Sequence, residues 1–211
     1  VPSVPSITWA PVENFAIQRK LNSAVIACAH ENPSMFDSYI DYEQGGKYQG
    51  KPQEKENAWV FNPRVAQDGF VSPRTLHAAS DIVDQKDNLP PRALDAALDG
   101  VLGRAGGRTL SSFVRFLNDI TPYERVVVDP AKAPVTDNPT AQMVQVFQFI
   151  TRTETREHAA AVVAYVKRMK HEMQSLFVRN VANSQRIVTF ANAEGFTKML
   201  AENKIFLGGV K

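Results

Sequence analysis

The sequence predicts an all-α protein, and three observations lead to this class. Apolar residues recur at spacings of three and four through most of the chain, as they do on one face of a helix. Helix-start signals, in which a capping residue stands directly before a proline, occur repeatedly. Strand signals are scarce, and the best of them, Val126–Val128, lies in a capped helical context. The predicted architecture is therefore a helical bundle with additional C-terminal helices.

The first predicted segment, residues 1–69, begins with a helix over residues 12–29, followed by a short helix that starts at Pro33. Residues 41–69 are rich in Gly, Lys, Glu and Gln and have no helical period, so we expect a long solvated connection there. The single cysteine, Cys28, lies in the apolar helix. It excludes a disulfide framework within the chain and is expected to be a buried structural thiol.

The second predicted segment, residues 70–133, opens with Ser72 as N-cap and Pro73 as the first helical residue. Pro90 and Pro91 begin a further helix, and Gly103 is the expected left-handed residue at its end. The pattern Thr121–Glu124 predicts a capping box for another helix.

The glycine-rich stretch Gly103–Thr109 resembles a phosphate-binding loop only superficially. Such a loop needs the pattern G-x-x-x-x-G-K-[ST] between a strand and a helix. Here the lysine is absent, the spacing fails and a helix precedes the stretch. We therefore expect a turn between two helices.

The third predicted segment, residues 134–211, begins with a helix capped by Asn138 and continues with the clearest helix, over residues 155–181. A last helix is expected over residues 192–203. The long helix carries an apolar stripe with the spacing of a seam against a partner helix. Its members are Val162, Val166, Met169, Met173 and Leu176.

Composition and motifs exclude several classes of function. With 24 Lys and Arg against 22 Asp and Glu, the net charge of +2 excludes a strongly electropositive protein. No apolar run approaches the about 18 residues of a transmembrane helix, and no signal peptide is visible, so we expect a cytoplasmic protein. The four histidines have no metal-ligand spacing, and no motif of nucleophilic catalysis occurs; we predict neither catalytic residues nor a metal site.

Arg74 is the candidate binding residue. Ser72 and Pro73 fix the start of a helix and so place Arg74 in its first turn. Free backbone N–H groups and the helix dipole favour an anion at that point, and an arginine adds a fork suited to phosphate oxygens. The alternative is an arginine in an ordinary surface salt bridge.

A family resemblance supports the phosphate interpretation. The run Gly69–Ser80, which contains the triplet Ser72–Arg74, resembles the sensor 2 region of MoxR-like AAA+ ATPases, where this triplet opens a helix of the small α-helical lid. Further matches to a bacterial and phage branch follow in order at residues 24–36, 87–90, 96–103, 113–117 and 123–130. The resemblance covers about residues 20–130, and residues 135–211 carry no family mark.

The resemblance implies that Arg74 is the sensor 2 arginine, which contacts the γ-phosphate of ATP and couples its hydrolysis to lid movement. The family's Walker A lysine, Walker B carboxylates, sensor 1 and arginine finger have no match here. The chain, which begins at Val1 and not at Met, is thus expected to be the C-terminal half of such an ATPase, inactive alone. ATP and Mg²⁺ would bind only through the missing N-terminal core, and the full-length protein would be an oligomer that remodels a protein partner.

Two other hypotheses remain open. The chain could be a stand-alone helical adaptor or scaffold of phage origin, which binds protein partners through the stripe from Val162 to Leu176. The weaker one is nucleic-acid binding through a small basic patch on the same helix. The patch comprises Lys167, Arg168, Lys170 and His171, and the residues expected to contact the nucleic acid are Lys167, Arg168, Lys170 and Arg179.

Overall fold

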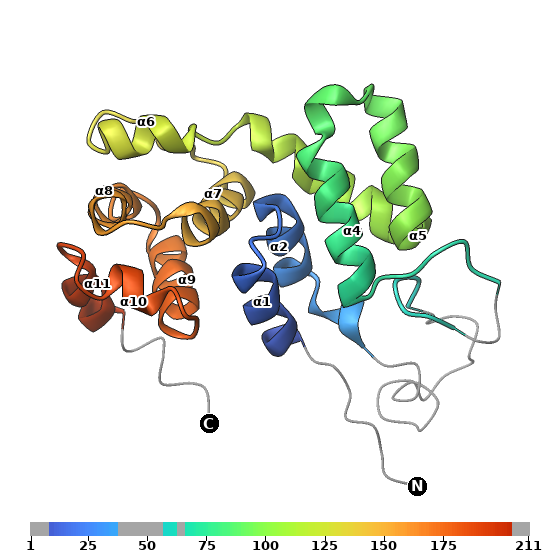
Figure 1. Cartoon of the computed structure of the whole chain (residues 1–211), viewed down its shortest axis with the longest axis horizontal. Helices are drawn as coiled ribbons and strands as arrows, with labels where there is room; N and C mark the ends of the chain where they lie inside the picture. Colours follow the sequence, from blue (N-terminus) through green and yellow to red (C-terminus); the bar gives the residue numbers. More distant parts are fainter. Residues whose placement is uncertain (1–8, 38–56, 63–65, 204–211) are drawn as a thin grey trace, which may run out of the picture.

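The computed structural model describes residues 9–37, 57–62 and 66–203. All regular secondary structure in these ranges is helical, which confirms the all-α class (Figure 1). The elements in chain order are α1 (Trp9–Gln18), α2 (Ser23–Glu31), η1 (Pro33–Phe36), α4 (Pro73–Asp84), η2 (Lys86–Asn88), α5 (Pro91–Arg115), η3 (Phe116–Asn118), α6 (Tyr123–Val128), α7 (Pro139–Arg152), α8 (Arg156–Val166), α9 (His171–Ala182), α10 (Ile187–Phe190) and α11 (Phe196–Glu202).

Helix α2 is the central element of the molecule. Every residue from Ser23 to Ala29 is buried, as expected for a helix that is apolar or small on all sides. Helices α1, α4, α5 and α7 pack around it, with α4 and α5 on one side and α7 on the other (Figure 1). The fully buried Ala24 and Ala27 keep the helix slim and let its neighbours approach closely.

The predicted helix over residues 12–29 is wrong in one respect, because the chain breaks it into α1 and α2. The break includes Lys20, which at φ 55° is the one non-glycine residue of the described ranges with positive φ. Asn22 then caps α2 by accepting from the backbone N–H of Ala24 at 3.0 Å. Its own N–H donates to Ser80 Oγ at 2.8 Å. The helical spacing of apolar residues continues through the link between α1 and α2, so this spacing does not reveal the break.

Helix α5 is a tight hairpin of two helical halves. The backbone leaves the helical conformation at Gly103 (φ 74°, ψ 161°), which confirms the turn predicted there, but the residues after it are helical at once. The halves lie so close that a Cβ on Gly107 would come within 2.3 Å of Asp99 Oδ1. Ser111 Oγ donates to Asp95 Oδ1 at 2.8 Å across the hairpin. The glycines therefore serve close helix packing.

The predicted capping box at Thr121–Glu124 does not form. Helix α6 starts after Pro122 without a side-chain cap. The Thr121 hydroxyl instead donates to the carbonyl of Pro134 at 2.6 Å, and its backbone N–H donates to Gln145 Oε1 at 3.2 Å. These partners lie far along the chain, so the local pattern was misleading. Residues 126–128 are helical, as predicted.

The predicted helix over residues 155–181 is two helices, α8 and α9, with a turn over residues 167–170. Met169, inside the turn, is only 5% exposed, so the apolar period continues where the helix does not. Asn138 caps α7 as predicted, by accepting from the N–H groups of Thr140 and Ala141. The last helix, α11, starts at Phe196, four residues later than predicted, after Gly195.

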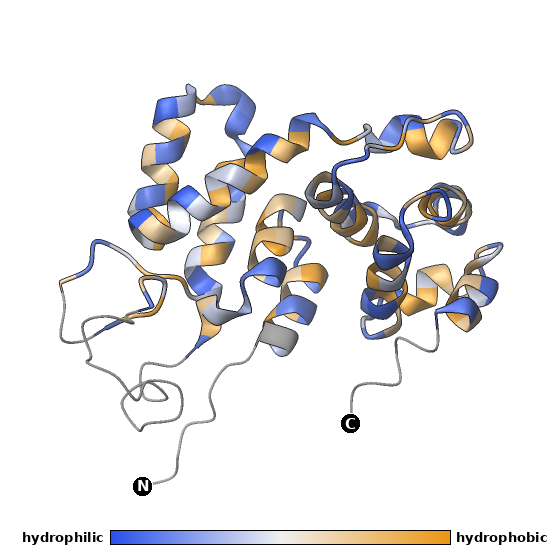
Figure 2. Ribbon diagram, turned by 180° about the vertical axis from the view of Figure 1, so that it is seen from behind, coloured by the Kyte–Doolittle hydropathy of each residue, from blue (hydrophilic) through white to orange (hydrophobic). Residues whose placement is uncertain are grey.

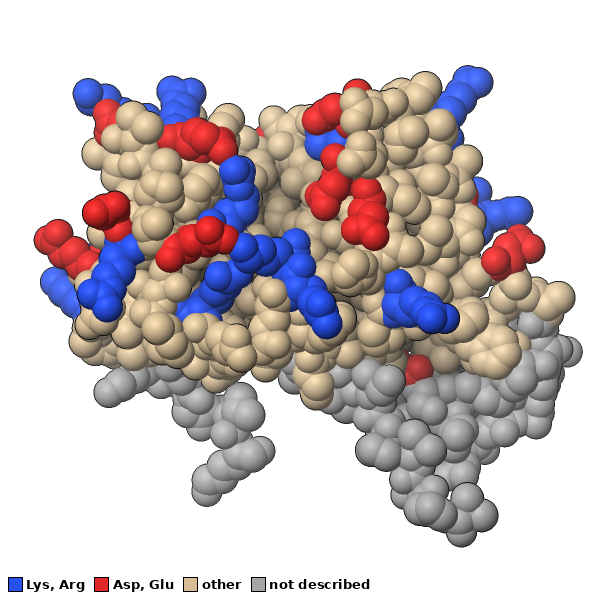
Figure 3. Space-filling view, viewed as in Figure 1, with Lys and Arg blue, Asp and Glu red and all other residues tan. Residues whose placement is uncertain are grey.

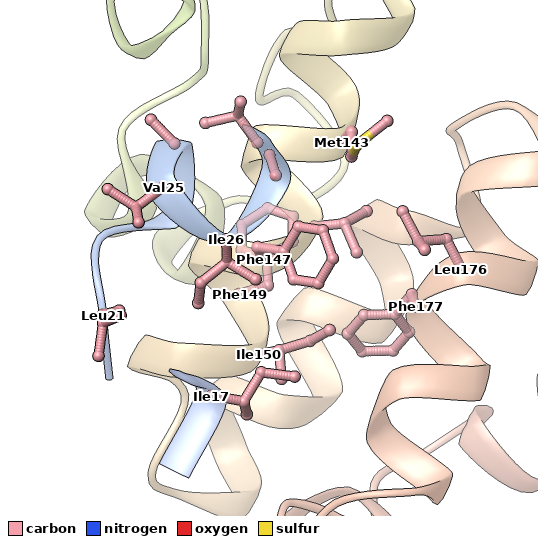
Figure 4. Packing of buried hydrophobic residues seen from close by; sticks show 14 of the residues in the cluster. Ile17, Leu21, Val25, Ile26, Met143, Phe147, Phe149, Ile150, Leu176 and Phe177 are labelled. Atoms are coloured by element: carbon pink, nitrogen blue, oxygen red, sulfur yellow. The ribbon is translucent and has the colours of Figure 1, made fainter. Parts of the chain in front are cut away.

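One hydrophobic core runs through the described part of the chain. Hydrophobic and hydrophilic residues alternate around most helices (Figure 2). Figure 4 shows Ile26 beside Phe147 and Ile17 beside Ile150, both of α7, and Ile150 beside Phe177 of α9. A cluster of edge-to-face and tilted rings, Phe177, Phe190 and Phe196, fills the C-terminal end.

Helices from all three predicted segments share this core, because α2 packs on both α5 and α7. The division into residues 1–69, 70–133 and 134–211 stays a prediction. Residues 57–62 and 66–69 of the expected long connection contain no helix or strand; its residues 41–56 and 63–65 lie outside the described ranges. No described helix combines the length and apolar character needed to cross a membrane.

Candidate functional site

Arg74 lies exposed in the first turn of α4, at the position that the sequence predicts. A reciprocal pair of hydrogen bonds fixes this helix start. Ser72 Oγ accepts from the N–H of Thr75 at 3.2 Å, and Thr75 Oγ1 accepts from the N–H of Ser72 at 2.8 Å. Pro73 occupies the first helical position, where its missing N–H costs nothing. Ser72 is therefore the N-cap and Pro73 the first helical residue, as the sequence predicts, whereas a role of both in positioning Arg74 for a ligand stays a prediction.

The Arg74 side chain has no hydrogen bond or ion pair within the described part of the chain. The surface salt bridge that the sequence leaves open as an alternative is thus not made there. The guanidinium borders an open depression of about 430 Å³ between α1 and α4. The lining residues are Phe15, Pro73, Arg74, His77, Ala78 and Asp81.

The depression combines one free cation with an aromatic wall. Phe15 is 39% exposed, which is unusual here for a large apolar side chain. Arg19 lies over its ring at 5.5 Å from the centroid. His77 Nδ1 lies 3.6 Å from Asp81 Oδ2, one turn along α4. This set can hold an oxyanion through Arg74, but it offers no activated nucleophile and no group of metal ligands.

A further polar cluster lies where α6 packs on α8. Tyr123 Oη lies 3.3 Å from Thr153 Oγ1 and 3.2 Å from His158 Nδ1. The guanidinium of Arg152 lies over the Tyr123 ring at 4.7 Å from its centroid. Burial raises the pKa of Tyr123, so its phenol stays protonated and serves as a neutral hydrogen-bonding group. No sequence signal distinguishes these residues, because they meet only through tertiary packing.

Cys28 and the histidines do not form a site. Cys28 is 1% exposed, and burial raises the pKa of its thiol to about 12, so no thiolate forms near neutral pH. His30 Nδ1 lies 2.7 Å from Glu13 Oε1, in a half-buried pair between α1 and α2. Within the described residues, no three His, Cys, Asp or Glu side chains gather as ligands for a metal ion.

The apolar stripe predicted as a partner surface is largely internal. Val162 and Val166 are fully buried, Met169 and Leu176 are nearly so, and Met173 is partly buried. The stripe is divided between two helices, because the turn at residues 167–170 separates α8 from α9, and its members pack in or against the protein's own core. It is therefore not available as one helical face for a partner.

Part of the predicted basic patch is also used inside the fold. The Arg168 guanidinium donates to the carbonyl oxygens of Pro130 at 2.5 Å and Ala133 at 2.7 Å, and so holds the loop after α6. Lys167 and Lys170 remain exposed at the turn between α8 and α9.

Comparisons of the chain with protein families, with curated proteins and with solved structures found no match.

Proposed function

We propose that the chain is the lid and helical tail of an AAA+ ATPase of the MoxR-like kind, and that Arg74 contacts a phosphate of ATP. One observation carries this proposal: an exposed arginine without a partner in the described residues stands in the first turn of a capped helix. The capping box and Pro73 hold the helix start in one conformation. A phosphate group would there receive the guanidinium fork together with the positive end of the helix dipole.

The placement of α4 suits a lid that transmits movement. Helix α4 packs along α5 and touches α2, the central helix of the molecule. A force on Arg74 would thus act on the whole bundle and not on a loose surface helix. Hydrolysis itself needs the Mg²⁺ and phosphate electrostatics of a catalytic core, which would hold ATP and Mg²⁺. In this proposal the complete protein is an oligomer in the cytoplasm that couples hydrolysis to remodelling of a protein partner.

The test uses the complete protein that this proposal implies, in which an ATPase core would precede this chain. Arg74→Ala is expected to lower ATP turnover about 100-fold or more, the scale for removing one preorganised donor from a developing oxyanion. Arg92→Ala is the matched control, because Arg92 also follows the first-position proline of its helix, α5, and is also exposed. Wild-type turnover and nucleotide affinity in Arg74→Ala would contradict the proposal.

The stand-alone adaptor is the second candidate. Burial of the stripe from Val162 to Leu176 removes the surface on which it was based. An adaptor would need a different exposed surface. In the described part of the chain, the charged surface around Lys20, Glu154 and Arg186 is a candidate.

A further inference from the structure

Two cations, Lys20 and Arg186, lie beside Glu154, where the link between α1 and α2 meets the end of α7 and the start of α10. Lys20 Nζ donates to Glu154 Oε1 across 134 positions of sequence. Arg186 Nη2 donates to the carbonyl oxygen of Thr151 at 3.1 Å, beside the same carboxylate. Arg19 neighbours Lys20 in sequence. Figure 3 shows Lys and Arg side chains gathered over the middle of this face of the molecule, with carboxylates among them.

The electrostatics of Glu154 reflect this setting. The hydrogen bond from Lys20 lowers the pKa of Glu154 most, and the charges of Lys20 and Arg186 lower it further. The carboxylate is therefore ionised near neutral pH and lies between two cations. Both partners of the ion pair are open to water, with side-chain exposures of 50% for Lys20 and 63% for Glu154.

We propose that Arg19, Lys20 and Arg186 form a docking surface for an acidic segment of a partner protein, whose carboxylate takes the place that Glu154 occupies in the free chain. An exposed ion pair contributes little to stability, because water and salt screen it. Glu154 can hence exchange for an incoming carboxylate at small cost. The surface does not include Arg74, but its Arg19 stacks on Phe15, which borders the depression beside Arg74. The test of this surface uses a peptide and no ATP, so it can fail while the proposed ATPase function holds.

Charge and composition favour an acidic protein over a nucleic acid as the occupant. Nucleic-acid binding depends on neutralising several phosphates with Lys and Arg, whereas this surface offers only Arg19, Lys20 and Arg186 and already contains a carboxylate. The exposed ring of Phe15 is covered by Arg19, so it is not a free platform for a stacked base. Arginine and aromatic side chains are enriched in protein–protein interfaces, and the pair of Arg19 and Phe15 supplies both.

The experiment measures the fluorescence anisotropy of a labelled oligoglutamate peptide and of an oligothymidylate of equal charge, each titrated with the full chain at low ionic strength. Arg19→Gln, Lys20→Gln and Arg186→Gln are each expected to weaken peptide binding about two- to fivefold, the range of exposed ion pairs. Glu154→Gln is expected to tighten it, because the cations lose their internal competitor. Arg19→Gln removes no hydrogen bond that the structure shows, so its effect is not one of misfolding.

Lys198 and Glu202 supply matched controls, since they form another exposed ion pair, on α11, with 3.9 Å between Nζ and Oε1. Lys198→Gln changes the net charge as Lys20→Gln does, and Glu202→Gln changes it as Glu154→Gln does. Both controls should leave peptide binding unaltered. Equal effects of the two sets of variants would show that peptide binding depends only on the net charge of the chain, and would overturn the proposal. Tighter binding of the oligothymidylate, or no peptide binding by wild type and Glu154→Gln, would also overturn it.

Discussion

Cys28 shows at the scale of one residue how burial decides reactivity. Its thiol lies on α2, which other helices surround, and its pKa rises from 9.0 to about 12 because burial disfavours the thiolate. We expect no reaction with a disulfide reagent at mildly alkaline pH in the native chain, and full reaction after unfolding in guanidinium. The absorbance of the aromatic thiol that the reagent releases measures the reaction of the native and of the unfolded chain. Modification of native protein at the rate of unfolded protein would contradict the burial of Cys28.

The same pKa shift couples stability to pH. Below pH 9 the thiol is protonated in both states, and its contribution to stability is fully present. As the pH rises from 9 toward about 12, the unfolded chain loses this proton and the folded chain keeps it, so the contribution is lost. Cys28→Ala should therefore show a smaller alkaline loss of stability than wild type.

At the scale of one element, the hairpin of α5 tests why its glycines are needed. A Cβ on Gly107 would meet the backbone nitrogen of Asp99 at 2.6 Å, whereas a Cβ on Gly100 would meet no atom within 4 Å. Gly107→Ala must push the two halves apart, and we expect a loss of about 1–3 kcal/mol. Gly100→Ala should instead stabilise the helix by about 0.5–1 kcal/mol. Urea unfolding followed by circular dichroism measures both; equal effects would contradict the close packing.

Helix starts could be predicted from the sequence where their physics is local. Ser72 and Asn138 cap their helices through N–H groups within three residues, so the neighbouring sequence contains the whole signal. Thr121 has the same pattern, but its bonds go to Pro134 and Gln145. The break at Lys20 is equally invisible, because it depends on the packing of α1 against α2.

The features of the candidate sites also differ in whether they depend on neighbouring residues or on tertiary packing. The position of Arg74 follows from two neighbouring residues, and the sequence predicts it. That Phe15 borders the same depression, or that Lys20 meets Glu154, depends on the packing of segments far apart in the chain. No local pattern contains this information.

At the scale of the whole molecule, the continuous core predicts a coupled response of distant helices. Phe147 on α7 is fully buried and lies 5.4 Å, between ring centroids, from His30 on α2. Phe147→Ala removes a large side chain between α2 and the C-terminal helices, and we expect a loss of about 3–5 kcal/mol. Phe61→Ala is the control, because Phe61 is 51% exposed and should cost far less.

Hydrogen exchange read by mass spectrometry shows how far this loss spreads. If α2 joins the two sides of the molecule into one cooperative unit, Phe147→Ala lowers the protection of α4 and of α9 together. Loss of protection in α9 with α4 unchanged would contradict a single unit and would favour residues 70–133 and 134–211 as separately folding parts. Coupled loss matters for function as well, because a contact made by Arg74 at the start of α4 can then reach the C-terminal helices through the packing of α2 against α7.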